Sequence, residues 1–164
     1  MKIEDEIQQP KFKHEFHKLG VNLIYTAAWL NYRVEKMLNE HELTTAQFNL
    51  LRILRGQYPN ACTVNLLIER MIDKSSNASR IVDKLIEKKL VERKQCKEDR
   101  RAVDVMITNG GLNLLKEIDK REDEMFSVFN TLKKSEAKQM NELLDKLRGN
   151  NKAEDGRQKL EEKK

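Results

Sequence analysis

The fold of this chain is decided by one stretch, SSNASRIVDKLIEKKLVERKQCKEDRRAVDVMITNGG, at residues 75–111. Apolar residues recur at helical spacing within 81–86, and the pattern changes to strand-like alternation at 103–107. Leu90 and Val91 begin one strand, and the polar run 94–101 separates that strand from the second one at 103–107. The stretch therefore predicts a helix followed by a β-hairpin with a long, charged tip.

Other helices are expected on both sides of this stretch. Apolar residues recur at helical spacing over 12–38, and a second apolar set there predicts a face covered by a partner chain. That second set is Val21, Ile24, Ala28 and Tyr32. A fifth helix is expected to extend to Leu132. The expected N-caps are Thr44 or Thr45, Thr63, Ser75 or Ser76, and Thr108, and Ser135 opens a sixth helix.

The order of these elements predicts the fold class. Three short helices and a two-stranded hairpin between long helices indicate a mainly α protein, a winged helix-turn-helix with long N- and C-terminal dimerisation helices. We expect an N-terminal dimerisation helix at 1–43 and the winged helix-turn-helix lobe at 44–108. The C-terminal dimerisation helices are expected at 109–148, followed by a polar, disordered tail at 149–164.

Charge is concentrated in one part of the chain. The 164 residues carry a formal net charge of +5. Residues 74–105 hold ten basic and six acidic residues, whereas the remaining segments are nearly balanced. A local basic segment in a neutral scaffold favours contact with nucleic-acid phosphates. The alternative is an ordinary solvated helix face.

Several classes of function are not favoured by the sequence. No stretch is long and apolar enough for a membrane span, and the start lacks a signal-peptide pattern, so we expect a cytoplasmic protein without a membrane partner. No phosphate loop or catalytic triad spacing is present, so we expect no enzyme activity and no cofactor. Cys62 and Cys96 form no zinc or disulfide pattern. We interpret His14 and His17 as a polar helix face rather than a metal site, and a sensor role for Cys96 is the weaker alternative.

Residues in the deciding stretch resemble the multiple-antibiotic-resistance-regulator (MarR) family of bacterial transcription factors. The matching segments are 79–85 (SRIVDKL), 90–93 (LVER) and 99–103 (DRRAV), with Thr108 and Gly111 as the family's Thr-x-x-Gly. The layout is similar over about residues 12–148. One departure is Lys89, where the family usually has glycine; a non-glycine residue in the left-handed conformation costs about 1 kcal/mol.

The helix expected at residues 76–88 would lie in the major groove of DNA, with its N-terminal residues deepest. Asn77 can pair with adenine and Arg80 with guanine, whereas the alternative is that the Ser-Ser-Asn run only caps the helix. The resemblance implies that Arg101 enters the minor groove and that Asp99 orients it. The alternative is an ion pair between these two residues that stiffens the tip. The full set of DNA-binding candidates is Ser75, Ser76, Asn77, Ser79, Arg80, Lys84, Lys94, Lys97, Asp99, Arg100 and Arg101.

The expected function is a transcriptional regulator that binds double-stranded DNA. We expect a ligand-released repressor that acts as a homodimer on a pseudo-palindromic operator. The resemblance implies that a small aromatic or lipophilic ligand binds near Tyr25, Trp29, Tyr32 and Phe48, although plain core positions would show the same spacing. One alternative is a helical dimerisation or protein-interaction module that has lost DNA readout. The other is a small-molecule or metal sensor.

Overall fold

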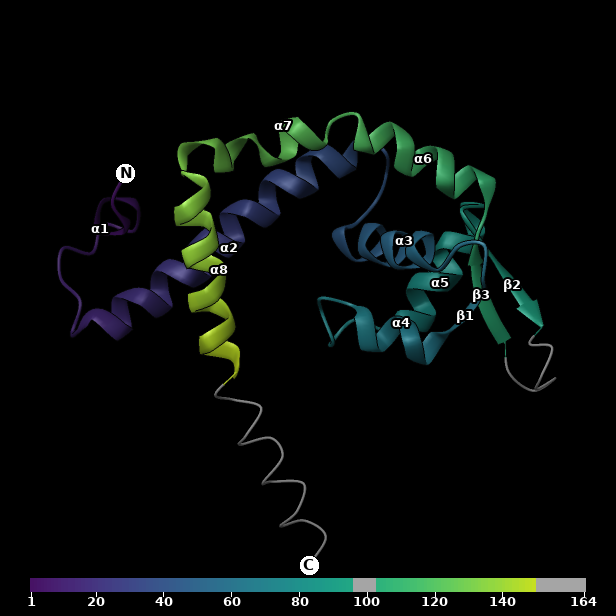
Figure 1. Ribbon diagram of the computed structural model, residues 1–164, viewed down its shortest axis with the longest axis horizontal. Coiled ribbons are helices and arrows are strands. Elements are labelled where there is room, and N and C mark those ends of the chain that lie inside the picture. The colour runs from purple at the N-terminus through teal and green to yellow at the C-terminus, as the bar shows by residue number, and fades with distance from the viewer. Residues whose placement is uncertain (96–102, 150–164) are drawn as a thin grey trace, which may run out of the picture. The chain divides into compact units, whose positions relative to one another are not determined.

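The computed structural model describes residues 1–95 and 103–149, and the chain divides into two units, Met1–Arg121 and Glu122–Lys164 (Figure 1). The helices of the first unit are α1 (Ile3–Glu6), α2 (Glu15–Asn39), α3 (Thr45–Gln57), α4 (Val64–Arg70), α5 (Ala78–Glu87) and α6 (Asn109–Asp119). Its strands are β1 (Cys62–Thr63), β2 (Val91–Gln95) and β3 (Val103–Ile107). The second unit contains α7 (Glu122–Phe126), the 3₁₀ helix η1 (Ser127–Thr131) and α8 (Lys134–Gly149). The structure is therefore mainly helical with a small sheet, as the sequence predicted.

Threonine side chains start three of the helices, as predicted. The hydroxyl of Thr44 accepts a hydrogen bond from the backbone N–H of Gln47, and the Gln47 side chain accepts one in return from the Thr44 N–H. The hydroxyls of Thr63 and Thr108 accept similar bonds at the starts of α4 and α6. These bonds satisfy backbone donors that have no partner inside the helix.

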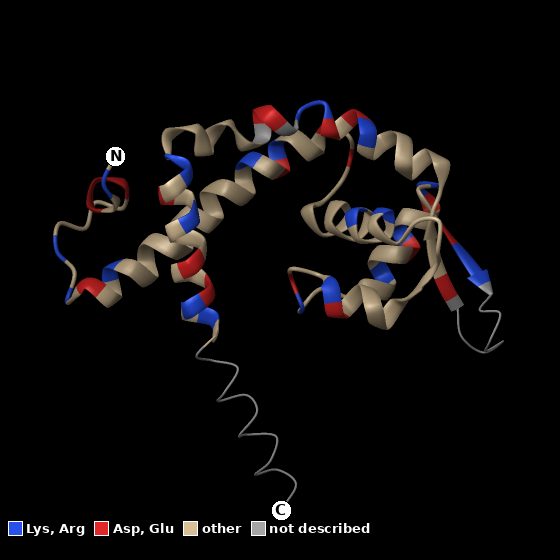
Figure 2. Ribbon diagram, viewed as in Figure 1, with Lys and Arg blue, Asp and Glu red and all other residues tan. Residues whose placement is uncertain are grey.

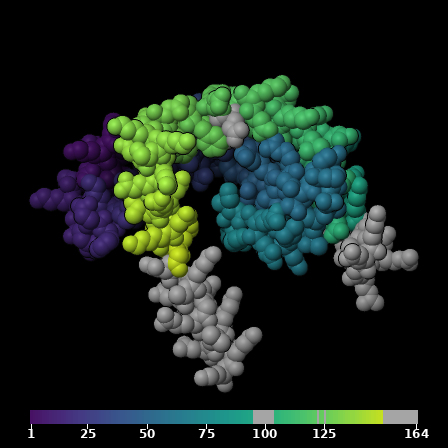
Figure 3. Space-filling view, in the orientation of Figure 1, coloured from purple at the N-terminus to yellow at the C-terminus, as the bar shows by residue number. Residues whose placement is uncertain are grey.

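The main apolar core lies between α3, α4, α5 and the sheet. Its most deeply buried side chains include Leu50, Leu51, Leu54, Leu67, Leu85, Val105 and Ile107. These elements form one continuous lobe in the space-filling view (Figure 3). The sheet is antiparallel, with the strand order β1-β3-β2, and Val91 pairs with Ile107 at the base of the hairpin. The hairpin therefore packs its apolar face against the helices.

Some predicted boundaries were wrong. Asn77, and not Ser75 or Ser76, caps α5, and α8 begins at Lys134, one residue before Ser135. Residues 62–63 form an additional strand, which was not expected because a two-residue strand has no detectable sequence pattern.

The expected helix from Thr108 to Leu132 is interrupted between α6 and α7. At that point Asp119 forms an ion pair with Arg55 and Arg121 one with Glu40, each at 2.5 Å. No glycine or proline lies between α6 and α7, so no local sequence signal marked the break.

The long helix α2 keeps much of its apolar surface exposed. Phe16 is 82% exposed, Ile24 74% and Tyr32 66%. The N-terminal helix α1 folds back toward α2 through an ion pair between Glu4 and Lys18 at 2.6 Å. In the described part of the chain, every helix is too short or too polar to cross a membrane.

Candidate nucleic-acid interface

Helix α5 presents two chemically different faces. Val82 and Leu85 are buried against α3, α4 and β2, because residues three or four apart lie on the same side of a helix. The opposite face is exposed and polar. It consists of Ser79, Arg80, Asp83, Lys84 and Glu87. This short helix is therefore held by its apolar side and offers hydrogen-bonding and charged groups on the other.

Two basic side chains of α5 are available for an external partner. Within residues 1–95 and 103–149, neither Arg80 nor Lys84 has a side-chain hydrogen bond or ion pair, and both are exposed. Ser79 is exposed next to them. Basic residues also lie along β2, so helix α5 and the hairpin both carry cationic groups (Figure 2). An unpaired guanidinium keeps all its donors for a ligand.

The predicted residues before α5 are already bonded to other parts of the protein. The side-chain oxygen of Asn77 accepts a hydrogen bond from the Arg80 N–H at 3.0 Å, which confirms a capping role. The hydroxyls of Ser75 and Ser76 donate to the carboxylate of Asp73 at 2.6 and 2.7 Å. These bonds, that of the Ser75 hydroxyl first, lower the pKa of Asp73 below its ordinary value. Asp73 was missed by the sequence reasoning because its partners depend on the conformation of this turn.

An ion pair joins α5 to the hairpin. A guanidinium nitrogen of Arg93 on β2 lies 2.5 Å from a carboxylate oxygen of Asp83. Arg93 was not predicted as a site residue, although it follows Val91 at the strand period of two and so lies on the helix-facing side. Lys94 is 3.5 Å from Glu92 on the same strand. Both pairs are about half exposed, so each adds little to the stability of the fold. Of the two, the Asp83–Arg93 pair is the one that joins the hairpin to α5.

The predicted hairpin tip lies outside the residues that the structure describes. This applies to Lys97, Asp99, Arg100 and Arg101, and to Cys96, so their proposed roles stay predictions.

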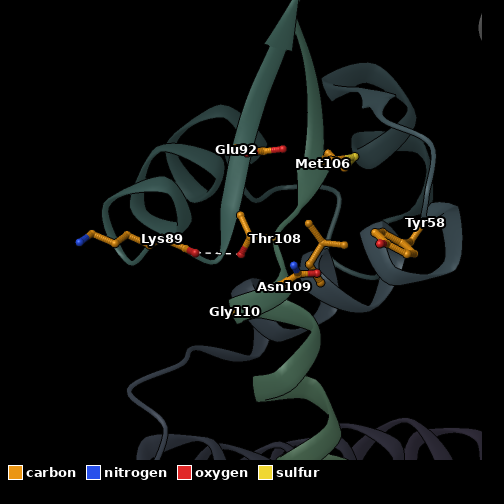
Figure 4. Close-up of a pocket in the computed structure, with 8 residues that line it drawn as sticks. Tyr58, Lys89, Glu92, Met106, Thr108, Asn109 and Gly110 are labelled. Atoms are coloured by element: carbon orange, nitrogen blue, oxygen red, sulfur yellow. Dashed lines mark hydrogen bonds between the residues drawn. The ribbon is translucent and has the colours of Figure 1, made fainter.

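The base of the hairpin is joined tightly to α6. Lys89 has a φ of 60°, the left-handed conformation expected where the family usually has glycine. The Thr108 hydroxyl donates to the Lys89 carbonyl at 2.8 Å (Figure 4). It also accepts from the Gly111 N–H at 3.1 Å. A Cβ on Gly111 would lie only 2.4 Å from the Leu90 carbonyl oxygen. The Thr-x-x-Gly pattern thus has a physical basis, one hydroxyl that joins two elements and one position without space for a side chain.

An open hollow of about 440 Å³ lies beside this junction. Tyr58 and Met106 line one part of it, and the first residues of α6 line another (Figure 4). The Lys89 side chain extends away from the other residues drawn.

The four aromatic candidates for ligand contact have different surroundings. Phe48 is buried in the lobe, whereas Tyr32 is 66% exposed. The hydroxyl of Tyr25 donates to Glu6 at 2.6 Å, which raises the pKa of this tyrosine. The guanidinium of Arg33 lies 5.5 Å from the centre of the Trp29 ring. A ligand role for these residues stays a prediction.

His14, one of the two histidines considered for metal binding, has a structural role. The Nδ1 atom of His14 accepts a hydrogen bond from the His17 N–H and caps α2. Among the described residues, no cluster of three or more potential metal ligands is present. Burial raises the pKa of the Cys62 thiol, with Asp104 as a second cause, which agrees with a packing role.

The region that contains the capped helix α5 and the basic hairpin matches a family of regulators. Residues 43–103 match the model of the MarR family. The chain is 31% identical over 138 residues to YpoP of Bacillus subtilis, an uncharacterised HTH-type transcriptional regulator. The alignment covers 79% of this chain and 96% of YpoP. The chain belongs to the MarR family. It is therefore a transcriptional regulator with a winged helix-turn-helix.

Solved structures of the family have the same fold. Bordetella bronchiseptica BpsR, whose structure concerns regulation of DNA binding by 6-hydroxynicotinic acid, matches with a TM-score of 0.72 and 25% identity. The match covers 84% of this chain and 97% of that one. S. aureus MepR in complex with DNA matches with a TM-score of 0.73 and 20% identity, over 85% and 99% of the two chains. The MepR match at this identity concerns the fold alone.

Proposed function

We propose that this MarR-family regulator is a cytoplasmic repressor without catalytic activity that binds a pseudo-palindromic operator as a homodimer. Helix α5 would enter the major groove and the hairpin tip would contact the adjacent minor groove, with Arg101 as the inserted residue. A small aromatic or lipophilic ligand would release the protein from its operator. The observation that carries this proposal is the exposed face of α5, where Ser79, Arg80 and Lys84 have no partner within the described residues.

The free basic groups of α5 suit DNA in two ways. The guanidinium of Arg80, near the helix N-terminus, can make two parallel hydrogen bonds to a guanine edge. The ammonium of Lys84, one turn further along, suits a phosphate, which contributes affinity but no sequence preference. The ion pair between Asp83 and Arg93 keeps the hairpin beside the helix. These contacts together provide base readout and backbone attachment on one surface.

A second copy of the chain would cover the exposed apolar surfaces of the dimerisation helices. Within the first unit, Phe16, Ile24 and Tyr32 of α2 are each more than 65% exposed. Within the second unit, α8 buries none of its residues and exposes Met140, Leu143 and Leu147. Exposed apolar stripes of this kind mark protein interfaces. A two-fold dimer would place the two α5 helices about one DNA turn apart, roughly 34 Å.

The proposal is tested by selecting DNA fragments with the purified protein and measuring affinity for the enriched site against salt. We expect log affinity to fall steeply with log salt. Arg80→Ala should relax preference at one base position, and Lys84→Ala should weaken all sites and reduce the salt slope by about 1. Lys116→Ala on α6 is the matched control and should change neither quantity.

Two outcomes would overturn parts of this function. Weak, salt-indifferent binding would favour the protein-interaction alternative. A monomeric mass in solution at micromolar concentration would exclude the homodimer.

Ligand release can be followed separately through Trp29, the single tryptophan, by titration with 6-hydroxynicotinic acid, the compound connected with BpsR. A change in Trp29 fluorescence with loss of DNA binding is expected.

A further inference from the structure

The carboxylate of Asp73 accepts hydrogen bonds from two serine hydroxyls just before the start of α5. One carboxylate oxygen of Asp73 accepts from both the backbone N–H of Ser75 at 2.9 Å and its hydroxyl at 2.6 Å. The other oxygen accepts from the hydroxyl of Ser76 at 2.7 Å. These distances are those of hydrogen bonds to an ionised acceptor. Both serine protons are therefore directed at one carboxylate.

This arrangement determines which hydrogen bonds the serines can offer outward. A hydroxyl has one proton to donate and two lone pairs that accept. Because the protons of Ser75 and Ser76 are held by Asp73, each oxygen presents only lone pairs to a ligand. Ser75 is exposed and Ser76 is partly exposed, so both residues lie at the surface where a ligand can approach.

Acceptor oxygens suit only some groups on DNA. In the major groove the donors are the amino groups of adenine and cytosine, whereas the exposed atoms of guanine N7 and O6, thymine O4 and the phosphates are acceptors. We propose that Asp73 is a positioning residue that turns Ser75 and Ser76 into hydrogen-bond acceptors, so that the start of α5 selects adenine or cytosine. This inference rests on the proposed binding of α5 in the major groove.

The charge of Asp73 would add to this selectivity. The neighbouring cation, Lys74, directs its ammonium group to the backbone carbonyls of Ile68 and Glu69 at the end of α4. In the described part of the chain, no cation forms an ion pair with Asp73. An unneutralised carboxylate at the DNA-facing end of α5 repels phosphates and so disfavours non-specific complexes.

The test compares the base preferences of the unmodified protein, Asp73→Asn and Glu117→Gln by selection from random DNA. The amide of Asp73→Asn can donate to one serine oxygen, which turns that hydroxyl proton outward. We expect preference for adenine or cytosine at the facing positions to fall about fivefold, and binding to random DNA to become tighter because a negative charge is lost. Glu117→Gln removes the same charge from an exposed position of α6, outside the proposed interface, and should change neither quantity.

The double variant Ser75→Ala/Ser76→Ala provides a second test of whether Asp73 acts through the two serines. It should lose the same preference, and adding Asp73→Asn to it should cause no further loss, because Asp73 acts through these serines. Melting temperatures check that each variant is folded.

Two results would overturn the inference. One is Asp73→Asn that keeps the original preference at every position, and the other is a uniform loss of affinity with unchanged preference, which a purely structural role would give. Failure to enrich any sequence with the unmodified protein would instead refute the proposed function, and the inference with it.

Discussion

Substitution of Gly111 by alanine tests the junction between the hairpin and α6. The added Cβ would lie 2.4 Å from the Leu90 carbonyl oxygen and 2.7 Å from Cγ1 of Ile107. Ordinary contacts begin near 3.4 Å, so the Cβ and this oxygen would have to separate by about 1 Å. The oxygen belongs to the backbone and already accepts the Thr108 N–H at 3.1 Å, and Ile107 is 1% exposed. Neither neighbour can move aside alone.

The expected loss of stability follows from these contacts. Overpacking of this kind costs about 1–3 kcal/mol, and one weakened hydrogen bond adds about 1 kcal/mol. Gly111→Ala should therefore lower the free energy of unfolding by about 2–4 kcal/mol and the melting temperature by about 5–15 °C. Urea unfolding followed by circular dichroism measures this, with all variants at one protein concentration because the stability of the proposed homodimer would depend on concentration.

Two matched glycine substitutions serve as controls. A Cβ on Gly110 would have only ordinary contacts at 3.4 Å, so Gly110→Ala should be nearly neutral. Nothing lies within 4 Å of a Cβ on Gly20 in α2, so Gly20→Ala should increase stability by about 0.5–1 kcal/mol. If Gly111→Ala unfolded at the same urea concentration as the unmodified protein, or all three variants shifted equally, the close approach at Gly111 would be refuted.

Three further predictions concern other parts of the first unit. Thr44→Ala removes the hydroxyl half of the capping box with Gln47 and should lower the free energy of unfolding by about 1 kcal/mol, whereas an unchanged urea midpoint would contradict the cap. Because burial raises the pKa of Cys62, its thiol should be alkylated at pH 8 only in denaturant; labelling at equal rates in the native protein would show that it is accessible. The bond with Lys18 lowers the pKa of Glu4, and Glu4 in turn raises that of Lys18. Docking of α1 should therefore be complete between about pH 4.5 and 10.5, weakening as pH falls through the lowered Glu4 pKa or rises through the raised Lys18 pKa, and NMR shifts of residues 3–7 would detect this.

Much of the candidate site could be predicted because its signals are local. The polar face of α5 follows from helical spacing around Val82 and Leu85, and Arg80 and Lys84 then lie outward by the same geometry. The role of Asn77 was harder to assign, because a Ser-Ser-Asn run offers several caps of similar quality. In the structure Asp73 accepts hydrogen bonds from both serine hydroxyls, and Asn77 caps α5.

The sequence by itself determined helices α2 to α6 and α8, the threonine caps of α3, α4 and α6, the hairpin and the family resemblance. Each depends on residues within a few positions of one another, where periodicity and capping act. Tertiary structure alone decided the pairing of Cys62 with Val105, the ion pair between Asp83 and Arg93, and the break after Asp119. The first two features join residues that are not neighbours in the sequence, and the third has no local sequence signal. Folding brings such groups together through the burial of a shared core, which no local pattern specifies.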